Sequence, residues 1–580
     1  MKSLNTLQSY LVRLPPRLTT LSCLALALGG CSASGAASPA GAAGHGSGGS
    51  GSNGAGGSGG SIATTSSDAL PARIRRLANA EYDASVRALL GSTSSPSQEF
   101  SFPPDAKQGP ANSPAGPAFT VNDAQRVDPV LADKLDIAAQ ALVAEARQSG
   151  KLAALSPCSD ESAAGGEACA KSFIQSVGTR AYRRRLLDAE VAGLLKAYHV
   201  GADGYSHADG VAQVARVLLQ SPGFLYTTEI GEPGAGAGFV MTSDEIATAL
   251  AYLLTSGPPD DALLQVAASG TLATPEARES EAKRLLATPA GHERFVRVVR
   301  EWLGIDDVAR REKSQSVYPE FAALSQSMEK ESRAFIEEVL FNANGTLADL
   351  FGADWTIADA PLAAVYGATS AGDGQRISLA GSGRRGILSQ AAFLSVFATN
   401  NGSHPVFRGV ALMRRVACLP VPDPGALGIV VSSPAPDPSK TTRARFEAHA
   451  LDSGCAGCHG TIDNFGFAFE NFDGIGRWRT AENGLPIDAS VSLTTGSDLD
   501  GTYASSAELI DALARSTSVK QCLARQLFRS TAARSDASVQ EAEEGFVELW
   551  RQLPEEQQGR LADVLVAFVK SKAFIQRRTP

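Results

Sequence analysis

Cys455, Cys458 and His459 have the residue types and the spacing to do chemistry. They form the pattern C-x-x-C-H, in which two thiols can add to the vinyl groups of a haem and the imidazole can take one axial position of its iron. The motif therefore predicts one covalently attached haem c, with His459 as the proximal iron ligand. Two alternatives stay open: a zinc site, which needs four ligands where this stretch supplies three, and a motif that holds no cofactor.

A second axial ligand must come from upstream of the motif if a Met or His supplies it, because neither residue follows His459. The candidates are His404, expected on a loop before Pro405, Met413, expected on a helix where methionine usually packs in a core, and His449. His449 precedes His459 by only ten residues and would need a tight reversal of the chain. A fourth alternative is an open iron position, which would permit chemistry with peroxide or dioxygen.

Basic and aromatic residues surround the motif in the sequence. The arginines are candidate partners of the haem propionates or solvated surface charges, and the phenylalanines are expected to cover the porphyrin or to fill the core of the module. The arginines are Arg408, Arg443, Arg477 and Arg479, and the phenylalanines are Phe465, Phe467, Phe469 and Phe472.

Haem is attached outside the bacterial cytoplasm, so the motif predicts an export signal. Residues 1–31 have its features, with basic residues before a short apolar segment that is too short for a permanent membrane span. The segment ends in Leu28-Gly29-Gly30-Cys31, which resembles a lipobox, so Cys31 is expected to be lipidated. Cleavage near Ala33 or Ala36 by an ordinary signal peptidase is the alternative.

The residue after the predicted lipid anchor, Ser32, favours the outer membrane over retention at the inner membrane. Residues 32–67 are almost entirely Gly, Ser, Ala and Thr, which cannot bury a core, and they are expected to form a flexible tether. The sequence therefore predicts an outer-membrane lipoprotein whose folded part faces the periplasm or the cell surface.

Four of the eight cysteines have no role in export or haem attachment: Cys158, Cys169, Cys418 and Cys522. An even number in an exported protein predicts two disulfides, for which three pairings exist. We favour Cys158 with Cys169 because a Gly-Gly turn lies between them, which leaves Cys418 for Cys522. The alternative is that these cysteines are free buried thiols.

Composition limits the kinds of partner. The net charge is -9 and no basic stretch alternates with aromatic residues, which argues against nucleic acid. No apolar run of 18 or more residues follows the signal, so membrane contact is expected through the lipid anchor only.

Apolar residues recur at helical spacing through most of the chain, whereas strand signals are few and short. The fold class predicted is mainly α, with several helical modules in series and a cytochrome c-like haem-binding module near the C-terminus. The expected helices cover residues 77–90, 211–219, 243–254, 328–340, 507–513, 519–528 and 561–568.

A set of local motifs resembles the planctomycete-type cytochrome multi-domain family, exported proteins built from domains of unknown function and also common in myxobacteria. The motifs include Arg76-Leu77-Ala78-Asn79-Ala80-Glu81-Tyr82, Gln220-Ser221-Pro222-Gly223-Phe224-Leu225-Tyr226, Arg385-Gly386-Ile387-Leu388-Ser389-Gln390 and Gly466-Phe467-Ala468-Phe469-Glu470-Asn471-Phe472-Asp473. Arg185, Phe407 and Asn464 depart from the family pattern. The resemblance implies helical modules at 68–135, 160–230, 238–368 and 500–575, and a cytochrome c-like haem module at 382–482.

The leading hypothesis for function is a lipid-anchored mono-haem protein that passes single electrons to a periplasmic or cell-surface redox partner. One alternative is a haem-dependent oxidoreductase that acts on an unknown substrate. Another is a cell-surface binding or scaffold protein in which haem is only structural.

Overall fold

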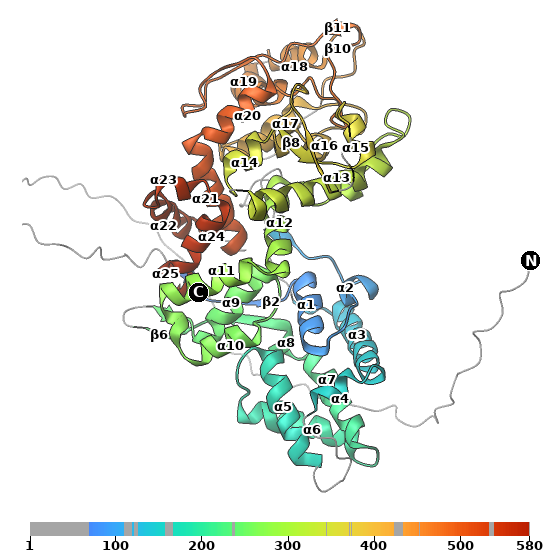
Figure 1. Ribbon diagram of the computed structural model, residues 1–580, viewed down its shortest axis with the longest axis vertical. Helices are drawn as coiled ribbons and strands as arrows, with labels where there is room; N and C mark the ends of the chain where they lie inside the picture. The colour runs from blue at the N-terminus through green and yellow to red at the C-terminus, as the bar shows by residue number, and fades with distance from the viewer. Residues whose placement is uncertain are drawn as a thin grey trace, which may run out of the picture. The chain divides into compact units, whose positions relative to one another are not determined.

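The structure is a computed structural model that describes residues 69–108, 119–120, 126–156, 166–234, 238–343, 345–369, 372, 374–422, 433–451, 453–532 and 539–578 (Figure 1). The predicted signal peptide, Cys31 and the predicted tether lie outside these residues. The described chain is mainly helical, as the sequence predicts. Among its helices, none is long and apolar enough to cross a membrane.

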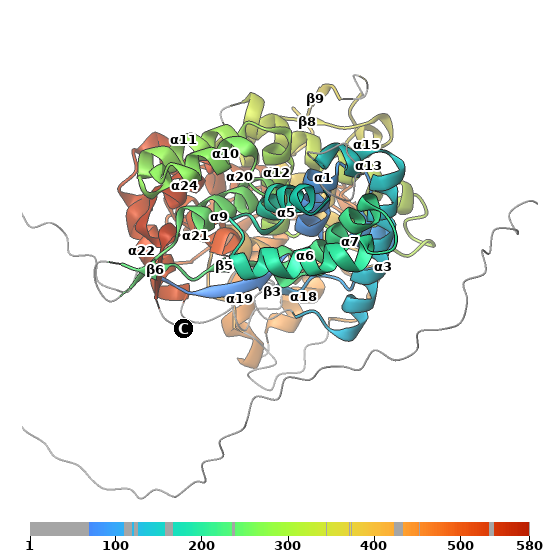
Figure 2. The ribbon, with the colours of Figure 1, turned by 90° about the horizontal axis from the view of Figure 1, so that it is seen from below.

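The first helical region, residues 79–225, has its own hydrophobic core, to which α1, α3, α5, α6 and α7 contribute apolar faces. These helices lie together in Figure 2. Helix α7 shows why these segments are helical, because Val211, Val214 and Leu218 recur at helical spacing and are fully or almost fully buried. The helices of this region are α1 (Asn79–Leu90), α2 (Pro96–Glu99), α3 (Pro129–Gln148), α4 (Lys151–Leu155), α5 (Gly166–Tyr182), α6 (Asp188–Ala202), α7 (His207–Gln220) and α8 (Pro222–Leu225).

A second and larger core runs from the middle of the chain to its end. Its first helices are α9 (Ser243–Thr255), α10 (Asp261–Ala268), α11 (Pro275–Leu286), α12 (Pro289–Leu303), α13 (Phe321–Glu337), α14 (Leu347–Gly352) and α15 (Ala360–Val365). Next come α16 (Ala391–Val396), α17 (Pro405–Ala411), α18 (Thr442–Ala450) and α19 (Ser453–Phe467). The last are α20 (Ser506–Arg515), α21 (Thr517–Ala532), α22 (Val539–Arg551), α23 (Glu555–Gln558), α24 (Leu561–Lys570) and α25 (Lys572–Ile575).

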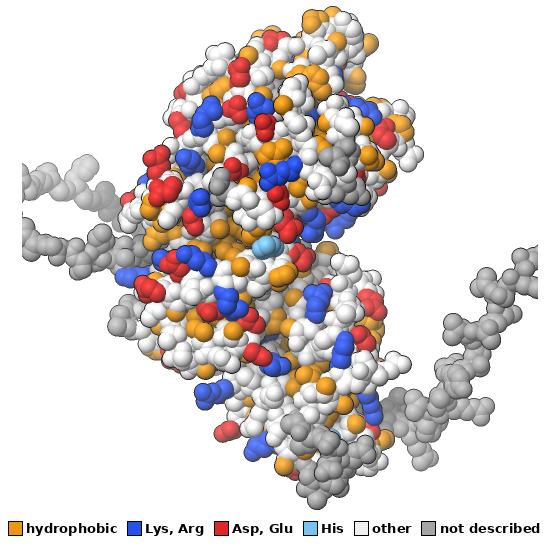
Figure 3. All heavy atoms as spheres, in the orientation of Figure 1, with side chains coloured by type: hydrophobic (Ala, Val, Ile, Leu, Met, Phe, Trp, Pro, Cys, Tyr) orange, Lys and Arg blue, Asp and Glu red, His pale blue; other side chains and the backbone are white. Residues whose placement is uncertain are grey.

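The seven helices expected from the sequence are confirmed, with shifted ends. Helix α9 begins where the sequence predicts, because Thr242 and Glu245 form a capping box in which each side chain accepts from the other's main-chain N–H. Helix α13 starts earlier than expected and continues into a π-turn, η4 (Glu338–Asn342). Charged side chains of both signs are interspersed on the face shown in Figure 3.

Short strands join segments that are far apart in the sequence. A four-stranded sheet has the order β1 (Leu70–Pro71), β14 (Gln576–Arg578), β7 (Phe239–Val240) and β6 (Glu232–Pro233). Strand β1 is parallel to β14, whereas β7 is antiparallel to it. Next to this sheet in sequence, β2 (Arg73–Arg76) pairs with β5 (Tyr226–Glu229), which places Arg73 opposite Glu229.

Four antiparallel pairs complete the described strands. They are β3 (Lys107–Gln108) with β4 (Phe119–Thr120), β8 (Trp355–Ile357) with β9 (Arg376–Ser378), β10 (Ala481–Glu482) with β11 (Leu485–Pro486), and β12 (Val491–Leu493) with β13 (Gly501–Tyr503).

A disulfide joins Cys418 to Cys522, with their Cα atoms 5.3 Å apart. This pairing confirms the prediction and ties the segment after α17 to helix α21. Cys169 is also disulfide-bonded, whereas Cys158, its predicted partner, lies outside the described residues.

Two glycines let α17 and α19 cross in close contact. A Cβ atom on Gly409 would lie 2.0 Å from the main-chain oxygen of Ile462, and one on Gly466 would lie 1.9 Å from that of Pro405. Both distances are impossible for real atoms, so only glycine fits these positions without separating the helices. The paired contacts also show that the two helices run antiparallel.

We expect Gly466→Ala to lower the free energy of unfolding by about 1–3 kcal/mol, because the added methyl group must push α19 away from α17. Denaturant unfolding followed by circular dichroism measures this change. Gly193→Ala is the control, because Gly193 is an exposed helical glycine whose Cβ would have no neighbour within 4 Å. The control should keep or raise stability, by up to about 1 kcal/mol, and equal effects in the two variants would contradict the close crossing.

Candidate haem-attachment site

The C-x-x-C-H motif occupies the first turns of helix α19. Cys458 is a free, half-buried thiol, and the His459 side chain is 17% exposed. The side chain of Cys455 lies outside the described part of the structure. Ala456, Gly457 and Gly460 are exposed, and a Cβ on either glycine would have no described atom within 4 Å. As far as the described residues go, this part of the helix surface is open beside the motif, which fits the attachment of a flat haem ring.

A buried carboxylate orients the predicted iron ligand. The Nδ1 atom of His459 lies 2.9 Å from Oδ1 of Asp463, one helical turn later. Asp463 is 3% exposed, and its hydrogen bond raises the pKa of His459. Because Nδ1 is held by the carboxylate, Nε2 is the nitrogen that would bind iron, as in histidine ligands that a second carboxylate orients. The sequence prediction missed Asp463, although a carboxylate four residues after the histidine on a helix is a readable signal.

His404, a candidate second ligand, has a structural role in this fold. It is 4% exposed and is the N-cap of α17, where Nδ1 accepts from the main-chain N–H of Phe407 at 3.2 Å. Its Nε2 atom lies 2.9 Å from Oγ of Ser433, and its ring stacks on Phe407 and meets Phe446 edge-on. Both ring nitrogens thus have partners, and His404 is packed rather than placed on an open loop.

Met413 lies in η6 (Leu412–Val416), a π-turn that continues α17. Met413 is 5% exposed. The element η6 contacts α19, the helix that carries the motif. Cys458 packs against the large core of the chain, to which Met413 also belongs. The third candidate, His449, belongs to α18, and its side chain lies outside the described residues.

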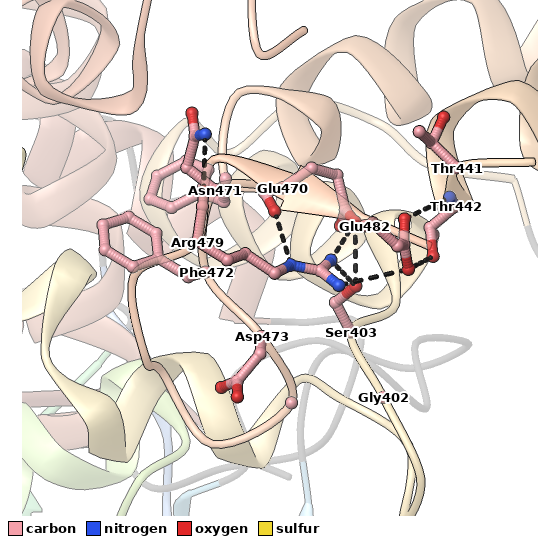
Figure 4. Close-up of polar contacts among 12 residues, drawn as sticks. Gly402, Ser403, Thr441, Thr442, Glu470, Asn471, Phe472, Asp473, Arg479 and Glu482 are labelled. Carbon is pink, nitrogen blue, oxygen red and sulfur yellow. Dashed lines mark hydrogen bonds and ion pairs between the residues drawn. The ribbon is translucent and has the colours of Figure 1, made fainter. Parts of the chain in front are cut away.

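Arg479 is the centre of a polar network that holds this module together (Figure 4). Its guanidinium donates to Glu470 Oε2 at 3.1 Å, to Ser403 Oγ at 3.0 Å and to Glu482 Oε1 at 3.1 Å. Glu482 in turn accepts from the main-chain N–H of Thr442 at 2.5 Å, at the first residue of α18. The network thereby fixes the starts of α17 and α18 relative to the segment that follows α19.

The other arginines considered as propionate partners also have protein partners. Arg408 is fully buried and donates to the main-chain carbonyls of Phe469, Phe472, Asp473 and Leu394, so the interpretation of this residue as a solvated charge is wrong. Arg443 contacts Glu447 and Arg477 contacts Glu320.

The four phenylalanines around the motif are all buried in the core of the module. Within the described residues, no group of three or more His, Cys, Asp or Glu side chains is arranged to hold a metal ion.

The buried state of His404 predicts a pH-dependent stability. Burial, and secondarily the positive charge of Arg408, lowers the pKa of His404 to about 4 from its usual 6.5. Above pH 6.5 His404 is neutral in both the folded and the unfolded protein. As the pH falls from about 6.5 to about 4, only the unfolded protein binds a proton at this residue, so the free energy of unfolding decreases. The loss is up to about 3 kcal/mol.

His404→Asn should remove this part of the pH dependence, because asparagine keeps a capping acceptor but does not titrate. Urea unfolding of both proteins between pH 7 and pH 4 measures the difference. Parallel pH profiles for the wild type and the variant would show that His404 is not the titrating group.

Comparison with known protein families finds four matches along the chain. PSD3 (DUF1587) matches residues 75–148, PSD5 (DUF1595) matches 169–229, PSD4 (DUF1592) matches 241–368 and PSCyt3 (DUF1588) matches 384–482, each described as a protein of unknown function. No curated protein and no solved structure matches the chain. The last match contains α17, α18, α19 and the network of Arg479. The chain belongs to the planctomycete cytochrome-like series of multi-domain proteins.

Proposed function

We propose that this protein is an exported, lipid-anchored c-type cytochrome-like protein that carries one covalent haem and transfers single electrons. The observation that carries the proposal is the C-x-x-C-H motif on α19, with Nδ1 of His459 held by the buried Asp463 inside the segment that matches PSCyt3. Cys455 and Cys458 would hold the haem, and His459 would bind its iron. A bound haem would supply one-electron redox chemistry.

The chain's own residues are suited to tuning such a site. Asp463 increases the basicity of His459, and second-shell hydrogen bonding of this kind is one of the means by which proteins set a haem potential. The glycine crossing packs α19 closely against α17, and a firmly held site suits electron transfer because it limits rearrangement between redox states. The redox partner is expected in the periplasm or at the cell surface, and the lipid on Cys31 would be the protein's only membrane contact.

The first test is haem attachment. The exported wild-type protein should give a haem-stained band after denaturing electrophoresis and an alkaline pyridine spectrum of one haem c per chain. Cys455→Ala with Cys458→Ala should lose the band completely, because no thioether can form.

The matched control is Cys418→Ala with Cys522→Ala, which removes the same number of cysteines but only a disulfide. This control should keep the haem and lose about 2–4 kcal/mol of stability. A folded, exported wild type without a haem band would overturn the proposal.

Among the candidate second ligands we propose Met413, because both ring nitrogens of His404 have partners in the fold. Met413→Leu, which nearly conserves volume and should cost less than about 1.5 kcal/mol of stability, is expected to open the iron to cyanide and to lower the reduction potential, since a thioether ligand raises it. His404→Asn is the control and should leave the spectra unchanged. Optical spectra with and without cyanide and a redox titration decide between them, and an unchanged spectrum of Met413→Leu would exclude Met413.

A further inference from the structure

A polar cavity of about 120 Å³ lies among segments from both halves of the chain. Its lining includes residues of β2, α1 and β5, of α9 and α12, and of the C-terminal elements α21 and β14. Five arginines and four acidic residues contribute to the lining, which is an unusual concentration of charge for the interior of a protein.

Three of these arginines have carboxylate partners. Arg73 and Arg577 both donate to Glu229, each at 2.6 Å. Arg75 forms a bidentate pair with Glu81, at 2.6 and 2.9 Å. Here three arginines share two carboxylates, so one positive charge remains on their side of the cavity.

The other two arginines, Arg294 and Arg297, face the cavity from one turn of α12 without a carboxylate partner in the described structure. Arg294 donates through Nε to the main-chain oxygen of Leu253 at 3.2 Å, and Arg297 donates to Oγ of Ser256. Glu301, the next acidic residue on this helix, accepts from Thr120 and makes no ion pair within the described residues.

The two guanidinium groups destabilise each other where they stand. Arg294 is half-buried, and desolvation, together with the charge of Arg297, lowers its pKa to about 10, although the charges of Glu301 and Glu81 act in the opposite direction. A partly buried guanidinium group that contacts no carboxylate in the described structure gains a direct partner when an anion binds beside it. Two neighbouring guanidinium groups also offer the planar pairs of N–H donors that bind the oxygens of phosphate-like anions.

We propose that this cavity is a binding site for a small tetrahedral oxyanion, such as inorganic phosphate or sulfate, held by Arg294 and Arg297. The volume is several times what one water molecule needs, but it is well below the size of pockets for larger organic ligands, at about 300–1000 Å³. The anion would bind where the segments matched by PSD3, PSD5 and PSD4 meet the C-terminal elements, so its binding would stabilise their association.

The test uses the full exported protein and titrates it with inorganic phosphate and, separately, with sulfate, at an ionic strength held constant with sodium chloride. Isothermal calorimetry gives the affinity, and thermal unfolding gives the stabilisation. We expect saturable binding and a rising Tm with both anions, and competition between them. A response no larger than that to chloride would overturn the proposal.

Variants locate the site. Arg294→Gln and Arg297→Gln should each weaken phosphate binding at least about tenfold, since each removes charge-assisted hydrogen bonds. Without phosphate, Arg294→Gln should be about as stable as the wild type, because the side chain is half-buried and contacts no carboxylate in the described structure. If Arg294→Gln fails to fold, Arg294→Lys should fold and still bind about tenfold more weakly, because a lysine lacks the paired donors.

The control is Arg310→Gln, an exposed arginine outside the cavity, which should keep the wild-type affinity. Unchanged affinity in both Arg294 variants would overturn the proposal. The haem band is read in every variant and should not change, so this test does not depend on the proposed redox function.

Discussion

Main-chain carbonyls buried in long loops need donors, and the structure meets this need with buried arginines. Arg408 donates to four main-chain oxygens and holds the segment that follows α19. Arg278 does the same for the end of α24, where it donates to Val569 and Lys570. Arg183 binds the carbonyls of Gly223, Phe224 and Tyr226. A neutral residue at these positions would leave several buried acceptors without partners, which is costly, so the loops between the helices depend on these guanidinium groups.

Helix positions and types were readable from the sequence because they follow from local periodicity. The stripe of Val211, Val214 and Leu218 fixes α7, and the capping residues fix the start of α9. The sheet of β1, β14, β7 and β6 was not readable, because its strands have two or three residues each and β14 pairs with two strands far away in the sequence. So short a strand carries no periodic signal, and only the tertiary fold determines its partner.

The haem-attachment site was readable in its ligands but not in its support. The motif identifies Cys455, Cys458 and His459 by spacing alone, whereas the role of His404 as a helix cap depends on where α17 begins in space. Arg408 shows the same limit, because a buried arginine and a solvated one look alike in a sequence. The roles of His404 and Arg408 depend on contacts with residues far away in the sequence. The local sequence carries no information about those contacts.

The pairing of β1 with β14 closes the described chain into a loop, because its first and last strands are hydrogen-bonded neighbours. Neighbouring strands lie about 5 Å apart, so the segment that enters the fold and the one that leaves it do so at nearly the same point. Because β1 and β14 are parallel, a connection from the end of β14 to the start of β1 would have to cross over, with about a dozen residues or more. With that connection the chain could be reopened elsewhere, for example between α22 and α23. Such a permuted chain would keep every module while its new ends emerged far along the sequence from the predicted tether.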